Sequence, residues 1–301
     1  MAVLVIGAGI SGIACARALH DAGAEVRVVE RGHVVGGRLA TKRYAGRPTD
    51  IGAAYLTARD PGFRTVVDDW TARGLALPWT DTLLAIEGGV RERTTGPTRF
   101  AAAGGLRSLV VDLASGLDVT TGHTATAEEV TGTVVLAMPG PQAARLLPAG
   151  HPAHRAAAGQ RWHPALAVTL RYADRTWPDF KSAFVNGHPV LQSVADDGSR
   201  RGDGAPVLVA HTTPDHARGH LDAPEAAGPE VAEAVGALFD LPAPVAVHVH
   251  RWTFATPAYP ADTPFLLADG VGLVGDAWGS PRVETAWLSG TALARALVDE
   301  V

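Results

Sequence analysis

Two short apolar runs near the start of the chain flank a helical pattern. Val3 to Ile6 and Glu25 to Val29 have the length and composition of buried parallel strands. Between them, small and apolar side chains recur on one helical face that ends near Gly23: Ile13, Ala14, Ala16, Ala18 and Leu19. This order predicts a strand, a helix and a second strand, which is a βαβ unit.

The end of the chain repeats part of this pattern. Val271 to Val274 is another short apolar run, and residues 283–301 have helical spacing throughout. A loop that contains Pro281 separates the two segments. The pattern predicts a closing strand, turn and helix.

The middle of the chain favours a second, mixed unit. Leu166 to Leu170, Val207 to His211 and Val245 to His250 have strand-like patterns, and together they predict an antiparallel sheet. Pro224 to Leu241 is patterned as an amphipathic helix that covers this sheet. The polar, glycine-rich stretch from Asp196 to Gly204 is interpreted as a mobile loop rather than a binding site.

A glycine turn follows the first predicted strand directly. In Gly7-Ala-Gly9-Ile10-Ser11-Gly12 the first glycine permits the tight turn, the second lets the backbone reach a pyrophosphate, and the third lets helix pack on strand. Helix N-terminal N–H groups then receive the phosphates. Glu30 ends the second predicted strand, where its carboxylate can accept hydrogen bonds from ribose hydroxyls. NAD and FAD both satisfy these contacts.

The next segment distinguishes the two cofactors by resemblance. Arg31 and Gly36-Gly37-Arg38 resemble the R-x-G-G-R extension of the amine oxidase-like flavoprotein superfamily, which implies FAD. The glycines let the chain pass close to the pyrophosphate, and Arg38 adds a planar, charged set of donors. A surface turn with a solvated arginine is the simpler alternative.

Several stretches together resemble the bacterial renalase-like branch of that superfamily, whose members bind FAD and oxidise dihydronicotinamide isomers or other small reductants. The resemblance covers most of the chain and includes the following segments: Asp50-Ile-Gly52-Ala53, Tyr55 to Phe63, Trp79, Ala183 to Asn186, His250 to Trp252, Gly275-Asp276, Arg282 to Glu284 and Ala286 to Gly290.

The resemblance also implies roles for the C-terminal segment. Asp276, after Gly275, hydrogen-bonds the ribityl chain of FAD. The helix N-terminus near Val283, Glu284 and Ala286 stabilises negative charge that develops at N1 and O2 of the flavin. Gly52 and Ala53 join the cofactor-binding set. Taken alone, this segment is explained better as a turn and an amphipathic core helix; the N-terminal motif reverses that preference.

Three features depart from that family. Ile51 and Ala54 replace His and Gln around the Gly-Ala pair, which predicts a more apolar substrate side and allows a different substrate. The usual hairpin is trimmed to residues 128–132, which affects the contacts to adenine. Residues 162–167 lack the aromatic and thioether side chains expected beside the ring, so the pocket shape differs.

Catalytic candidates are few because hydride transfer to flavin N5 needs no protein nucleophile. Trp252, Trp278 and Trp287 are candidates for flat walls beside the ring, although core packing explains them equally well. His163, His211 and His250 are candidates for proton handling. Larger amine oxidases often place a lysine near N5 on a strand of the substrate lobe. Residues 165–171 contain none, which argues against ordinary amine oxidation.

A metal site is not expected. His211, His216 and His220 are spaced like ligands, but Pro214 interrupts any single helix and no carboxylate triad accompanies them. Cys15 is the only cysteine, which excludes a disulfide framework. It lies in the first helix, far from the ring, so FAD is expected to be non-covalent.

These patterns predict an α/β protein with a discontinuous Rossmann-type FAD-binding lobe and an α+β substrate lobe with an antiparallel sheet. The FAD-binding domain takes residues 1–58, 104–142 and 268–301. The substrate-binding domain takes residues 59–103 and 143–267. Substrate is expected at the junction of the lobes.

Composition and charge limit the kinds of partner that the protein is expected to bind. With 301 residues, 47% of them hydrophobic and 19% charged, the chain can bury a globular core. A net charge of −5 gives no electrostatic footprint for nucleic acid or an anionic membrane. The chain opens on an apolar run without a basic leader, and no apolar run reaches about 18 residues. We therefore expect a cytoplasmic protein whose partners are a small-molecule substrate and molecular oxygen; the oligomeric state is undetermined.

Three hypotheses of function follow. The first is a renalase-like oxidase that takes a hydride from a small donor, a dihydronicotinamide isomer above all, and returns it to oxygen as hydrogen peroxide. The second is a pathway-specific amine oxidase or desaturase of specialised metabolism. The third is a protein that uses FAD in a structural or non-redox role.

Overall fold

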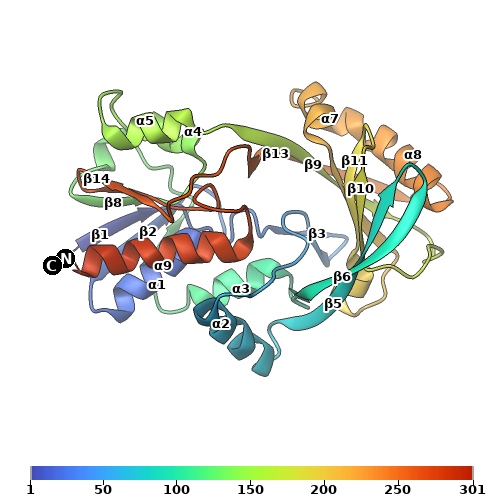
Figure 1. Ribbon diagram of the computed structural model, residues 1–301, viewed down its shortest axis with the longest axis horizontal. Helices are drawn as coiled ribbons and strands as arrows, with labels where there is room; N and C mark the ends of the chain where they lie inside the picture. The colour runs from blue at the N-terminus through green and yellow to red at the C-terminus, as the bar shows by residue number, and fades with distance from the viewer. Residues whose placement is uncertain (1, 300–301) are drawn as a thin grey trace.

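A six-stranded sheet gathers strands from both ends and the middle of the chain. The computed structural model describes residues 2–299, and in it this sheet has the order β14-β15-β8-β1-β2-β7 (Figure 1). Its strands are β1 (Ala2–Ile6), β2 (Glu25–Glu30), β7 (Asp118–Thr121), β8 (Thr133–Leu136), β14 (Leu266–Ala268) and β15 (Val271–Leu273). All neighbours are parallel except β14 and β15. The predicted Rossmann-type unit is confirmed.

Two helices from opposite ends of the chain lie against each other beside this sheet. Helix α1 (Ile10–Asp21) joins β1 to β2, and α9 (Val283–Asp299) closes the described chain next to it (Figure 1). A Cβ on Gly290 of α9 would lie 2.0 Å from the carbonyl oxygen of Ser11, so only glycine permits this approach. Residues 300 and 301 of the expected C-terminal helix lie outside the described residues.

A seven-stranded sheet forms the second lobe, in the order β13-β9-β12-β11-β10-β5-β6. Its strands are β5 (Leu77–Glu87), β6 (Val90–Ala101), β9 (Trp162–Arg171), β10 (Ser182–Asn186), β11 (Leu191–Asp196), β12 (Val207–Thr212) and β13 (Ala246–Pro257). Each pairing is antiparallel except that of β5 with β10. The predicted antiparallel sheet is therefore present, with one parallel pair.

Smaller elements complete both lobes. Helices α7 (Pro214–Gly219) and α8 (Ala227–Phe239) lie on the second sheet, with α8 preceded by a 3₁₀ turn η3 (Pro224–Ala226), and α6 (Asp197–Arg201) follows β11. The remaining elements are β3 (Thr41–Tyr44), β4 (Arg47–Asp50), α2 (Pro61–Ala72), α3 (Leu106–Leu113), η1 (Ala127–Glu129), α4 (Gly140–Ala143), η2 (Ala144–Leu146) and α5 (Pro152–Gly159). Strands β3 and β4 form a separate ribbon.

The polar stretch from Asp196 to Gly204 is not an exposed excursion. Four of its charged side chains are buried: Asp196, Asp197, Arg200 and Arg201. They belong to the helix α6 and its N-cap, which pack beneath the ribbon of β3 and β4 through ion pairs. The interpretation as a mobile loop is wrong because charge pairing across 150 residues of sequence holds this segment in place.

Core packing bears on the division into domains. Phe63, Val67 and Trp70 of α2 share a core cluster with α1 and α3, whereas Ala153 and Ala157 of α5 pack with strands of the six-stranded sheet. We propose that residues 1–58, 104–142 and 268–301 form the FAD-binding unit. Helices α2 and α5, placed by sequence in the substrate unit, extend that core.

Candidate functional site

The glycine turn after β1 has the geometry that its sequence predicts. Gly7 has φ +110°, and a Cβ on Gly12 would lie 2.0 Å from the carbonyl oxygen of Gly7. Gly9 is the N-cap of α1, and among the described residues no side chain caps the helix there. The first N–H groups of α1 are thus available to an anion.

A second loop closes over this turn. Gly36 donates its N–H to the carbonyl oxygen of Ala8 at 2.8 Å, which seats the Gly36-Gly37-Arg38 loop on the turn. A Cβ on Gly37 would lie 3.1 Å from the Cα of Gly9, so the two backbones face each other across a space that a side chain would fill. This is the kind of cradle in which backbone can approach a pyrophosphate.

Glu30 supports the turn from the end of β2. Its carboxylate accepts hydrogen bonds from the N–H groups of Ala8 at 2.8 Å and Gly32 at 2.6 Å. Because each carboxylate oxygen has a second lone pair, the predicted contact with a ribose hydroxyl stays compatible with this arrangement. Arg31, the next residue, is exposed.

Arg38 and Asp276 come together from the two ends of the chain. The guanidinium donates to both carboxylate oxygens, at 2.8 and 2.5 Å, and also to the carbonyl oxygen of Ala255 at 3.0 Å. The same guanidinium lies over the ring of Trp162, 5.0 Å from its centroid. A bidentate pair of this kind fixes both side chains, and it joins the two segments that sequence assigned to FAD.

The turn before α9 leaves open space beside this pair. Gly275 has φ +146°, and a Cβ built on it would meet nothing within 4 Å in the described structure. Its N–H donates to the hydroxyl of Ser289 at 3.0 Å, which ties the turn to α9. The backbone therefore borders free space next to Asp276.

The start of α9 differs in part from the prediction. Glu284 is 5% exposed, and its carboxylate accepts hydrogen bonds from the N–H groups of Arg59 at 2.5 Å and Asp60 at 2.7 Å. The N–H of Ala286 donates to the carbonyl oxygen of Arg282. The N–H of Ala286 is thus already hydrogen-bonded within the first turn, and the Glu284 side chain holds the segment before α2. The N–H groups at the very start of the helix belong to Val283 and Glu284.

The segment from Asp50 to Ala54 runs under Arg38. A Cβ on Gly52 would lie 1.8 Å from the carbonyl oxygen of Arg38, and Ala53 donates its N–H to the same oxygen at 3.0 Å. From the other side, Trp252 donates from Nε1 to the carbonyl oxygen of Ile51 at 2.7 Å. The segment is therefore held between the two lobes.

The side chains of Ile51 and Ala54 do not point into one shared surface. Ile51 is fully buried and packs with Ala40, Ala167 and Trp252, while Ala54 packs with Trp79. The sequence predicted that Ile51 and Ala54 make the substrate side more apolar. The Ile51 side chain packs in the core instead of lining an open surface.

The tryptophans named as ring-facing candidates separate into two groups. Trp278 and Trp287 are each 8% exposed and pack in the core beside the six-stranded sheet. Trp252 on β13 is partly buried at the lobe junction, where the ring of His250 meets it edge to face with 4.6 Å between centroids. Trp252 thus borders the lobe junction and the other two lie in core clusters, and contact of any of the three with the flavin ring stays a prediction.

Two of the three candidate histidines, His211 and His250, have a lowered pKa. Burial lowers the pKa of His211 to about 4; the positive charge of Arg200 acts in the same direction, and hydrogen bonding to the backbone of Ile51 and Gly52 opposes it. Burial lowers the pKa of His250 to about 4, and the positive charges of Lys42 and Arg251 act in the same direction to a smaller extent. Both rings are therefore neutral at pH 7. His163 pairs with Arg218 at 3.1 Å.

A buried ion network, which sequence reasoning missed, positions the same segment. Arg200 is fully buried and donates to the carbonyl oxygens of Asp50 at 3.1 Å and Ala54 at 3.0 Å, while it pairs with Asp197. Burial alone would raise the pKa of Asp197, but Arg200 and Arg201 lower it, so the carboxylate stays ionised. The Arg-Arg pair after two aspartates is the sequence signal that could have revealed this network.

These residues fit FAD. The uncapped α1 N-terminus and the facing backbones of Gly9 and Gly37 suit a pyrophosphate, and the open space at Gly275 lies beside a fixed Arg38–Asp276 pair. Burial raises the pKa of Cys15 to about 12, which makes its thiol unreactive and favours non-covalent binding.

Similarity to known proteins shows the family to which the chain belongs. The family of flavin containing amine oxidoreductases matches residues 90–298, and the NAD(P)-binding Rossmann-like domain matches residues 5–70. The chain belongs to the flavin containing amine oxidoreductase family. Membership confirms the expected class, an FAD-dependent oxidoreductase, and the expected cofactor.

Similar proteins agree with this assignment. Polyamine oxidase 4 of Oryza sativa subsp. japonica is 54% identical over 54 residues, and flavin-containing amine oxidase B of Cavia porcellus is 47% identical over 55 residues. Each match covers 18% of this chain and 11% of the relative's length.

Solved structures share the fold of this oxidoreductase. Cyclohexylamine oxidase from Brevibacterium oxydans has a TM-score of 0.75 and 16% identity, with 99% of this chain and 98% of that chain covered. Putrescine oxidase bound to putrescine has a TM-score of 0.76 and 17% identity, with 99% of each chain covered. At such identities the likeness extends to the fold alone.

Within residues 2–299, none of the helices combines the length and apolarity needed to cross a membrane.

Proposed function

We propose that this flavoprotein is a renalase-like oxidase that takes a hydride from a small, uncharged organic donor, a dihydronicotinamide isomer above all. The observation that carries the proposal is the meeting of Arg38 and Asp276, since it joins both expected cofactor segments. Arg38 also donates to the carbonyl oxygen of Ala255 on β13, the strand of the second lobe that carries Trp252 and His250. FAD, when bound, supplies the two-electron acceptor, which molecular oxygen regenerates with release of hydrogen peroxide.

The protein's own residues hold and orient the reactants. Backbone N–H groups of α1 and the Arg38 guanidinium would bind the phosphates of FAD, and Asp276 would accept hydrogen bonds from hydroxyls of its ribityl chain. Trp252 offers a flat surface at the junction, fixed by its hydrogen bond to Ile51. A planar donor stacked there is oriented for transfer without a protein nucleophile.

The charges around the junction favour a neutral donor. Asp276 is paired with Arg38, Asp50 with Arg201, and the carboxylate of Glu284 with two backbone N–H groups. A cationic diamine needs a carboxylate that is free to pair with it. His211 and His250 are neutral at pH 7, so neither ring adds charge toward the donor.

Amine oxidation is the second candidate. It is favoured by the family itself and by the relatives named polyamine oxidase. Against it, the chain has only two lysines, and neither lies on β9, the strand of the substrate lobe next to β13. A pathway-specific amine oxidase or desaturase therefore needs a different arrangement near N5.

Anaerobic reduction separates the candidates. The purified holoprotein is mixed with dihydronicotinamide isomers or with putrescine while absorbance at the flavin maximum is followed, and air is then admitted. Rapid bleaching by the isomers that recovers in air supports the proposal. Bleaching by the amine instead supports the second candidate. A spectrum that no donor changes contradicts both and favours a non-redox role for FAD.

Trp252→Phe adds a control within the same experiment. Phenylalanine keeps a flat ring but loses the Nε1 donor to Ile51. We expect slower bleaching by the isomers at unchanged FAD content, because the wall loses its fixed orientation. Trp278→Phe, in the core, should leave the bleaching rate close to that of the wild type.

A further inference from the structure

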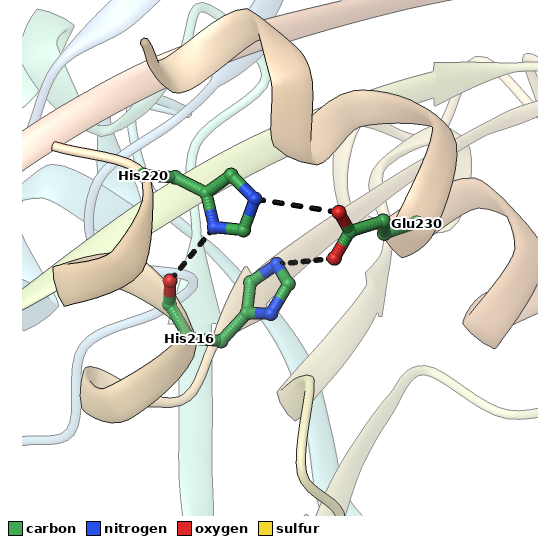
Figure 2. Close-up of side chains that lie close together, drawn as sticks. All are labelled: His216, His220 and Glu230. Atoms are coloured by element: carbon green, nitrogen blue, oxygen red, sulfur yellow. Dashed lines mark hydrogen bonds and ion pairs between the residues drawn. The ribbon is translucent and has the colours of Figure 1, made fainter. Parts of the chain in front are cut away.

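Two histidines and a glutamate cluster on the outer helices of the second lobe. His216 lies on α7, His220 directly follows that helix, and Glu230 lies on α8 (Figure 2). Nε2 of His220 lies 3.4 Å from Oε1 of Glu230, and Nε2 of His216 lies 3.8 Å from Oε2. All three ligand atoms lie within 4.8 Å of one another.

The sequence-based argument against a metal does not hold at this place. Pro214 was expected to interrupt the helix, but it is the first residue of α7, where proline is well accommodated. His216 on α7 and His220, the residue directly after its end, are therefore four positions apart, and the carboxylate comes from a different helix, α8. His211, on β12, is not part of the cluster.

The spacing suits a tetrahedral metal ion. With bonds of about 2.0–2.2 Å to nitrogen and oxygen, neighbouring ligand atoms of zinc lie about 3.3–3.5 Å apart. The distance of 3.4 Å ends on Oε1 of Glu230 and that of 3.8 Å on Oε2, and the Glu230 side chain, which is 54% exposed, can rotate to offer one oxygen to an ion held by both rings. Two imidazoles exclude Mg²⁺ and Ca²⁺ as preferred ions, since those ions take oxygen ligands.

The hydrogen bonding of His220 fixes the form of the ring that binds metal. Nδ1 of His220 lies 3.0 Å from the carbonyl oxygen of His216 (Figure 2). A carbonyl only accepts, so Nδ1 carries the proton and donates it. In the neutral ring, Nε2 then carries the lone pair and faces the cluster, which is how metal-binding histidines are commonly held.

His216 supplies an independent observation. Its side chain is 9% exposed, and its Nε2 is buried without a hydrogen-bond partner among the described residues. A buried ring nitrogen without a partner is costly. The atom faces Glu230, so an ion placed between the three side chains would satisfy it.

We propose that His216, His220 and Glu230 form a zinc site that joins α7 to α8. Three protein ligands leave a fourth position, which water fills because Glu230 lies at the surface. The site would fix α7, whose Arg218 pairs with His163 on β9. It would therefore stabilise the substrate lobe without taking part in hydride transfer.

Zinc binding to the untagged, FAD-loaded protein tests the proposal. The protein is treated with EDTA, dialysed and titrated with ZnCl₂ in a calorimeter, and the bound zinc is measured by mass spectrometry after dialysis. We expect one zinc per chain and a rise in Tm. Glu230→Gln and His220→Asn should each weaken zinc binding at least about 10-fold.

Matched controls keep the result interpretable. Glu233→Gln changes an exposed carboxylate on the same helix, and His20→Asn removes an exposed histidine of α1; both should bind zinc like the wild type. Glu230 is at the surface, so its variant is expected to fold. Absence of stoichiometric zinc in the wild type, or equal zinc binding by the Glu230→Gln variant, overturns the proposal.

Discussion

The guanidinium of Arg38 and the carboxylate of Asp276 form a bidentate ion pair between residues 238 positions apart in the chain. Asp276 is 9% exposed, and the guanidinium is further held by the carbonyl oxygen of Ala255 and the ring of Trp162. The pair thus fixes the orientation of the Arg38 guanidinium, whose N–H groups would donate to the phosphates of FAD. Each residue depends on the other for its position.

Loss of either partner should weaken cofactor binding. Arg38→Lys removes the planar fork, and Asp276→Asn removes the charge that orients it. Hydrogen bonds to charged groups contribute about 1.5–3 kcal/mol, so FAD affinity should fall about 10- to 100-fold in each variant. Titration of apoprotein with FAD, followed by flavin fluorescence, measures this. Arg64→Lys, in an exposed pair with Asp68, is the control; wild-type affinity in both site variants would refute the assigned roles.

Two glycines of the first turn should respond differently to alanine. Gly9 has φ −73°, and within residues 2–299 its Cβ would meet only the Cα of Gly37 at 4.0 Å, so Gly9→Ala should fold normally. The same Cβ would occupy the space that a pyrophosphate needs, and FAD affinity should drop more than 10-fold, or about 1.4 kcal/mol. Gly12→Ala should instead destabilise the fold, because its Cβ would lie 2.0 Å from the oxygen of Gly7.

Thermal unfolding of the two apoproteins, together with FAD titration, separates these effects. Gly159→Ala serves as control, since a Cβ there meets nothing within 4 Å among the described residues. If Gly9→Ala unfolds at a clearly lower Tm, or if it binds FAD like the wild type, the turn does not act as a phosphate cradle.

Arg200 should contribute strongly to stability. Its removal leaves the buried carboxylate of Asp197 without its closest partner and frees the carbonyl oxygens of Asp50 and Ala54. Breaking a buried ion pair costs about 3–5 kcal/mol, and we expect Arg200→Met to lose that much free energy of unfolding in urea. Arg64→Ala, in an exposed pair, should lose less than about 1 kcal/mol. Equal losses in both variants would contradict the account.

Stability should fall as the pH drops from about 6.5 to 4. Both His211 and His250 have a pKa lowered to about 4 in the folded protein, whereas the ordinary pKa of histidine is about 6.5. In that window the unfolded chain binds protons that the folded chain does not, so each ring favours unfolding as pH falls, by up to about 1.4 kcal/mol per pH unit and less where solvent screens it.

The slope of unfolding free energy against pH tests this expectation. His211→Asn cannot titrate and should make the slope between pH 4 and 6.5 shallower, whatever its effect on absolute stability. His20→Asn, on the exposed end of α1, should leave the slope unchanged. A flat pH dependence in the wild type would show that the two rings are not desolvated.

Local patterns predicted those elements whose hydrogen bonds and packing are set by nearby residues. The β1-α1-β2 unit, the final strand and helix, and α8 were all predicted from periodicity and from glycines with defined steric roles. The pairing of Arg38 with Asp276 was not predicted, although both were named, because periodicity carries no information on contacts across 238 residues.

Burial of charge was the main source of error. Residues 196–204 have the composition of a loop, and only partners far along the chain, Arg47 and Asp50, make their burial favourable. Ile51, Trp278 and Trp287, which were named for the site, are buried, and an apolar residue at a junction has the same sequence signature in the core and in a site. The hairpin of β5 and β6 was also missed, despite the Gly88-Gly89 turn that joins the strands.

The central claim is that both ends of the chain build one FAD site, and cofactor content tests it most directly. The purified protein is denatured, and the released FAD is measured by absorbance and divided by protein concentration. We expect one FAD per chain in the wild type, and a clear loss in both Arg38→Lys and Asp276→Asn after identical dialysis. A colourless wild-type protein that does not take up added FAD would contradict the claim.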